Sequence, residues 1–179
     1  MTIFSDTTIR MMRFVGWGLV ALILIAPMVA MQMDAEGVDW GAEDFIIIGA
    51  LLGGVGLTLE LAVRRTRNAA YLIGVGAALM TALLTIWANL AVGIIGDGGH
   101  AANLLFFAVV LFAVIGALAV KFEAAGLAKV MTLTGVAQAA MLATAIAMET
   151  EMVAILFIAA SVLGWLFSGQ GFRVAARQD

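Results

Sequence analysis

The charge-free stretch NAAYLIGVGAALMTALLTIWANLAVGIIG, residues 68–96, lies between Arg67 and Asp97 and decides how this chain folds. A helix needs about 20 apolar residues to cross the hydrocarbon core of a bilayer, and this stretch exceeds that length. Its polarity does not alternate from one residue to the next, as it would in the strand of a membrane barrel. The stretch therefore predicts a transmembrane helix over residues 69–95.

Five further apolar runs of similar length predict the remaining spans, at residues 14–33, 45–63, 101–120, 127–148 and 152–170. The composition agrees, because 64% of the 179 residues are apolar and only 12% are charged. So few charges cannot cover the surface of a soluble domain. We expect an all-α integral membrane protein, with residues 1–179 forming a single six-helix transmembrane bundle.

Charged residues separate cleanly when the chain crosses six times. All nine basic residues then fall on one side: Arg10, Arg13, Arg64, Arg65, Arg67, Lys121, Lys129, Arg173 and Arg177. The other side carries eight acids and no base: Asp34, Glu36, Asp39, Glu43, Asp44, Asp97, Glu149 and Glu151. The positive-inside rule predicts that both termini are cytoplasmic and that the acidic face is periplasmic.

Polar residues inside the predicted spans form a stripe. Thr81, Thr85 and Asn89 follow one another at steps of four residues, which places them on one helix face. Thr134 and Gln138 repeat this spacing in the fifth span. Such residues either bond neighbouring helices together or line a pathway for a polar solute, and both interpretations stay open.

Small residues mark the expected helix contacts, because close approach drives packing in lipid. Gly135, Ala139 and Ala143 recur every four residues in the fifth span. We expect close packing there and at three further glycines, Gly49, Gly53 and Gly93. The alternative interpretation is that these glycines leave room for a substrate or a hinge.

A polar loop and the last hairpin supply candidates for a periplasmic mouth: Asp97, His100, Asn103, Glu149 and Glu151. Converging carboxylates would attract cations, and a divalent ion is conceivable with His100 as a nitrogen ligand. However, one histidine without a partner at ligand spacing does not predict a metal site. The alternative is an ordinary helix end, with Asn103 capping the fourth span.

Glu60 is the only acid within a predicted span, and Arg64 follows it by four residues. An ion pair explains both residues, and a proton-relay carboxylate is the alternative. The chain has no cysteine, and phosphate-binding, dinucleotide, metalloprotease and serine-hydrolase motifs are absent. We therefore predict no catalytic residue, no cofactor and no nucleic-acid partner.

The run W-A-N-L-A-V-G-I-I-G, from Trp87 to Gly96, is followed by a polar loop and Ala102-Asn103-Leu104. It resembles a group of uncharacterised small bacterial inner-membrane proteins with a W-x-N-L-A-V-G-I-I-G run at the end of a membrane helix. Asp44-Phe45 and Glu60-Leu61 look similar too, whereas His100-Ala101 stands where that pattern has Asn-Pro. The resemblance implies a topology and a motif, and no activity.

Together these features predict a multi-pass protein of the bacterial cytoplasmic (inner) membrane. The leading function is transport or a channel with an acidic, cation-attracting periplasmic face, and the protein is not an enzyme. The alternative is a non-catalytic accessory or structural subunit of a larger membrane complex. An intramembrane enzyme ranks third. Expected partners are the lipid bilayer, cations at the acidic face, and either further copies of the chain or a larger membrane complex.

Overall fold

The structure is a computed structural model that describes residues 6–96 and 99–178. These residues form six α-helices and no strand, which confirms the all-helical prediction. In chain order the helices are α1 (Asp6–Gln32), α2 (Ala42–Arg65), α3 (Ala69–Ala91), α4 (Asn103–Ala119), α5 (Ala124–Ala147) and α6 (Met152–Ala175).

Five of the six helices, all except α4, are long and apolar enough to cross a membrane. The chain is therefore a multi-pass membrane protein. The α4 helix has 17 residues, and at 1.5 Å per residue it measures about 26 Å, slightly less than a hydrocarbon core of about 30 Å. It begins at Asn103 rather than near residue 101. Six crossings and cytoplasmic termini stay predictions.

The α3 helix ends earlier than the sequence predicts. Its last residue is Ala91, and Gly93 adopts φ +75° just beyond the end. This left-handed conformation commonly terminates helices and favours glycine, which has no Cβ. Gly93 therefore stops the helix and does not pack within it, contrary to our expectation. Ile94 and Ile95 then turn back into the protein, where both are buried.

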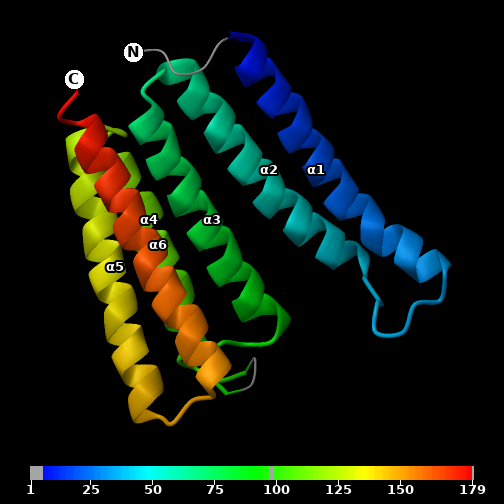
Figure 1. Cartoon of the computed structure of the whole chain (residues 1–179). Helices are drawn as coiled ribbons and strands as arrows, with labels where there is room; N and C mark the ends of the chain where they lie inside the picture. Colours follow the sequence, from blue (N-terminus) through cyan, green and yellow to red (C-terminus); the bar gives the residue numbers. More distant parts are fainter. Residues whose placement is uncertain (1–5, 97–98, 179) are drawn as a thin grey trace. The chain divides into compact units, whose positions relative to one another are not determined.

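The described chain divides after Arg67 into two compact units. The first is the hairpin of α1 and α2, which lie side by side and antiparallel (Figure 1). Its close contact lies at Gly56, where a Cβ atom would come within 2.9 Å of the Trp17 ring. Gly49 and Gly53, the expected contacts, have no described atom within 4 Å of their Cβ positions.

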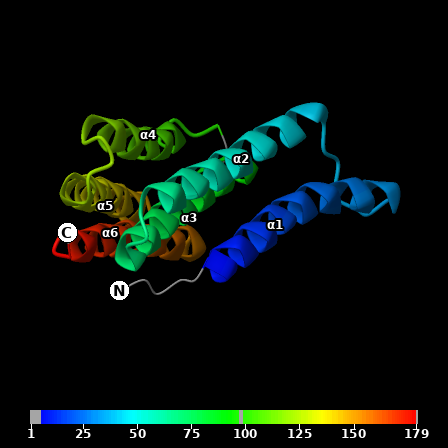
Figure 2. The same cartoon turned by 90° about the horizontal axis from the view of Figure 1, so that it is seen from above.

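The second part, the four-helix unit, comprises α3 to α6. In it α6 packs against α3 and α5, and α4 packs against α5 and α3 (Figures 1 and 2). The tightest approach joins α3 to α6. Ser168 Oγ donates a hydrogen bond to the Gly74 carbonyl at 2.8 Å, and a Cβ on Gly171 would lie 3.0 Å from Gly74 Cα. Small residues thus bring the two backbones together, as expected in lipid.

The small-residue face of α5 packs only in part. Gly135 is buried against Leu166 and Trp165, Ala139 is half-buried, and Ala143 is exposed. A step of four residues turns about 400°, so each step drifts about 40° around the helix. The buried face of α5 instead continues through Gln138, Met141 and Ala145. Among the described residues, Ala143 therefore has no close helix contact.

Candidate functional site

Asn103 holds together the end of the four-helix unit where α3 turns into α4. Its side-chain Oδ1 accepts hydrogen bonds from the backbone N–H groups of Ile94 (3.1 Å) and Ile95 (3.0 Å). Its Nδ2 donates to the Ile95 carbonyl at 3.1 Å. One side chain therefore pairs with three backbone groups that lie beyond the end of α3 and have no helical hydrogen bond. Asn103 is only 4% exposed.

Asn89 joins this arrangement from the last turn of α3. Its Nδ2 donates a hydrogen bond to the Asn103 carbonyl at 2.6 Å. We call Asn89, Asn103, Ile94 and Ile95 the asparagine clasp. The clasp packs on an apolar core that includes Phe106 from α4, so Asn103 has a structural role rather than a place at an open mouth.

The predicted polar stripe divides into two groups. The hydroxyls of Thr81 and Thr134 donate to the carbonyls of Ala77 and Val130, each one turn earlier in the same helix, at 2.8 and 2.9 Å. These two residues satisfy their donors locally. They bond neither a neighbouring helix nor a solute through the hydroxyl proton.

The remaining polar residues of the stripe are buried with atoms that lack partners. Among the described residues, Thr85 Oγ1, Asn89 Oδ1 and both amide atoms of Gln138 make no hydrogen bond. The three side chains are 1%, 5% and 0% exposed. Buried polar atoms are normally paired, so each of these atoms needs an explanation.

Trp165 belongs with them, and the sequence reasoning missed it. Its indole Nε1 is also unpaired, and the residue is 1% exposed near the middle of α6. Tryptophan in membrane proteins usually lies at the bilayer interface, where its N–H is hydrated. The signal in the sequence was weak, a tryptophan within a predicted span. We call Thr85, Asn89, Gln138 and Trp165 the polar layer.

The α3 and α6 members of the polar layer lie at neighbouring levels. Gly164 of α6 faces Thr81, because a Cβ on Gly164 would collide with the Thr81 hydroxyl oxygen. Since α3 and α6 run antiparallel, Thr85 lies one turn beyond this contact, beside the residues that precede Gly164 (Figure 1).

The α5 member lies at the same level. A Cβ on Gly135 would lie 3.4 Å from Trp165 Cβ, and Gln138 follows Gly135 by one turn. Helical side chains lean toward the N-terminus of their own helix, so the Trp165 indole leans toward the level of Gln138. Thr85, Gln138 and Trp165 therefore come from three helices at similar depths of the four-helix unit, and Asn89 lies one turn, about 6 Å, nearer to the end of α3.

The polar layer is electrically neutral. Helix α3 carries no charged residue between Ala69 and Ala91. The only charges on α5 and α6 are Lys129 and Arg173, about 14 Å and 12 Å along the helices from Gln138 and Trp165 at 1.5 Å per residue. Hydrogen bonding rather than charge is thus the chemistry that these side chains offer.

The candidate mouth residues lie apart from this layer. His100 is exposed, and its Nδ1 accepts a hydrogen bond from the Ala102 N–H at 3.2 Å, within one turn. Glu149 and Glu151 are exposed in the connection between α5 and α6, whereas Asp97 lies outside the described residues. Within residues 6–96 and 99–178, no three histidine, aspartate or glutamate side chains gather as a metal site.

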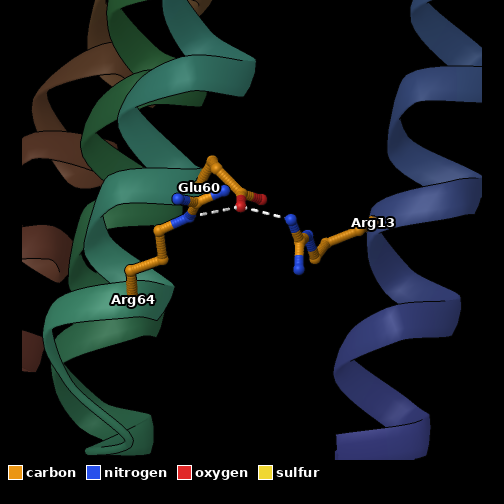
Figure 3. Close-up of polar contacts among 3 residues, drawn as sticks. All are labelled: Arg13, Glu60 and Arg64. Atoms are coloured by element: carbon orange, nitrogen blue, oxygen red, sulfur yellow. Dashed lines mark hydrogen bonds and ion pairs between the residues drawn. The ribbon is translucent and has the colours of Figure 1, made fainter.

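In the hairpin, Glu60 lies between two arginines, as Figure 3 shows. Its Oε1 accepts a hydrogen bond from Arg64 Nε at 2.7 Å, which confirms the predicted ion pair. The same oxygen also pairs with Arg13 of α1, a contact that sequence spacing could not reveal. A carboxylate held between two guanidinium groups fits a structural ion pair better than a proton relay.

No family model matches this chain, and no curated protein or solved structure matches it.

Proposed function

We propose that this chain is a non-enzymatic membrane protein of transport or channel type, and that a small hydrophilic species passes through its four-helix unit. The observation that carries the proposal is the polar layer, with five buried polar atoms that lack a partner among the described residues. Lipid offers these atoms no hydrogen bond, so the layer fits a visiting polar molecule.

The cost of leaving buried polar groups unpaired favours this proposal over a role in hydrogen bonding between helices. Each buried polar group without a partner costs about 1–3 kcal/mol. A purely structural role would place the groups in mutual hydrogen bonds, as Ser168 does with Gly74 across α3 and α6. Buried polar residues kept without partners in membrane helices are typical of solute pathways.

The distribution of charged residues supports a topology for the proposed function. We propose six crossings with both termini in the cytoplasm of a bacterium, which leaves the acidic face in the periplasm. Eight acids on that face raise the local cation concentration within a Debye length of about 8 Å. The acidic face therefore influences which solutes approach, whereas the polar layer lies deeper.

A flux assay tests the proposal. The purified protein is reconstituted in liposomes, and the entry of potassium, sodium, magnesium, water, urea and glycerol is compared with that in empty liposomes. We expect at least one species to cross faster, and Gln138→Leu to lower that flux about fivefold, because one hydrogen bond to the solute is lost. Thr144→Val is the matched control, since the exposed Thr144 bonds only to Ala140 of its own helix.

The competing proposal is an accessory subunit of a larger complex. Gly49 and Gly53 favour it, because they form a small-residue face on α2 that α1, the other helix of the hairpin, does not cover. Native mass spectrometry of the protein extracted from its own membrane separates the two proposals. Stable larger subunits, together with no flux for any solute, would replace the transport proposal with this one.

A further inference from the structure

The four polar-layer residues together offer both donors and acceptors. Trp165 Nε1 can only donate, whereas Thr85 and Gln138 can do both. Asn89 has an unpaired acceptor, Oδ1, whereas its Nδ2 already donates one hydrogen bond to the Asn103 carbonyl. A molecule that satisfies this set must itself both accept and donate hydrogen bonds.

The same set disfavours ions. A cation that leaves water needs several oxygen ligands or a carboxylate. The indole N–H of Trp165 can only donate a hydrogen bond, so it cannot serve as a ligand to a cation. An anion would need a positive group or a helix N-terminus. Gln138 and Trp165 lie near the middle of α5 and α6, and Asn89, which lies beside the start of α4, has its unpaired atom in Oδ1, an acceptor that repels an anion. Only an uncharged species enters without a large desolvation cost.

Packing around the layer limits the size of this species. A Cβ on Gly135 would lie 2.9 Å from Leu166 Cδ2, and Gly164 already touches Thr81. The helices that border the layer are thus closely packed even at glycines. Such packing excludes a large guest.

We infer that the polar layer of Thr85, Asn89, Gln138 and Trp165 is a binding site for a small, uncharged molecule that both donates and accepts hydrogen bonds. Water, urea and glycerol share this chemistry. The inference rests on the proposed function and deepens it, because it names the class of solute that crosses. Cations gather at the acidic face and do not pass the polar layer.

Two variants test the site in the reconstituted protein. Trp165→Phe removes the indole N–H and keeps a large aromatic ring, so folding is retained. We expect it to lower the permeation of water, urea or glycerol about three- to tenfold. Ser161→Ala is the matched control, because the Ser161 hydroxyl donates to Phe157 of its own helix at 2.9 Å. Potassium and sodium fluxes should equal those of empty liposomes.

A second measurement does not depend on flux. In protein labelled with nitrogen-15, the indole resonance of Trp165, assigned by its loss in Trp165→Phe, should exchange magnetisation with water although the residue is buried. Magnetisation exchange between the indole and water, without flux of any solute, would support the binding site and contradict the transport proposal. Flux of cations alone would preserve transport and overturn the neutral site. Neither flux nor exchange would overturn both.

Discussion

The two units of this chain handle polar groups inside a membrane in opposite ways. The α1–α2 hairpin has one acid within a predicted span, Glu60, which lies near the end of α2 and pairs with two arginines. The four-helix unit buries neutral polar groups inside its helices, and five of their atoms have no partner among the described residues. Charge in lipid must be paired or brought to the interface, whereas neutral groups can be kept unpaired at a moderate cost. The pairing of Glu60 therefore fits a structural ion pair, and the unpaired atoms of the polar layer support the binding site that we propose.

The largest expected effect on stability concerns the asparagine clasp. The clasp lies in the same unit as the polar layer, but the side chain of Asn103 is paired, so it shows what a paired polar group contributes there. Asn103→Leu should destabilise the protein by about 3 kcal/mol, since three buried backbone groups lose their partner. The free energy of unfolding in detergent measures this. His100→Ala, at an exposed residue nearby, should change it by about 0.5 kcal/mol or less. Equal effects of the two substitutions would contradict the clasp.

An intermediate effect is expected where the four-helix unit is tightest. Gly171→Ala should cost about 1–3 kcal/mol, because the new Cβ would lie 3.0–3.1 Å from backbone atoms of Ala70 and Gly74, which cannot move aside cheaply. Gly76→Ala in the neighbouring helix is the matched control. Its Cβ has no described atom within 4 Å, so the substitution should be neutral or should stabilise α3 slightly. Thermal unfolding in detergent distinguishes the two variants, and a harmless Gly171→Ala would refute the close α3–α6 approach.

The smallest effect is expected in the hairpin. Arg13→Gln should shift the unfolding temperature by about 2 °C or less, because the Arg13 and Arg64 side chains are 47% and 69% exposed and screened by water. Arg10→Gln is the control for loss of a basic residue without this ion pair. A shift as large as that of Asn103→Leu would remove the distinction between the two units, since it would make the Glu60 ion pair as important as the buried clasp.

Part of the candidate site follows from spacing alone. Thr85, Asn89 and Gln138 were predicted because polar residues four apart in an apolar run share a helix face. Spacing could not separate them from Thr81 and Thr134, whose hydroxyls bond to their own helices. That difference depends on side-chain rotation and on the neighbouring helix. Trp165 escaped notice for a similar reason, since an apolar residue in an apolar run reveals its polar atom only when its surroundings are known.

The sequence by itself determined the helical class, the membrane environment and the approximate helix positions, because these depend on the length and polarity of local runs. Tertiary structure alone decided which small residues touch. Gly171 and Gly74 meet across α3 and α6, whereas Ala143 lies on the exposed side of α5. It also decided that Asn103 holds the turn at Ile94 and Ile95 and that Arg13 reaches Glu60. These contacts join residues far apart in the chain, and local periodicity contains no information about which helix faces are neighbours.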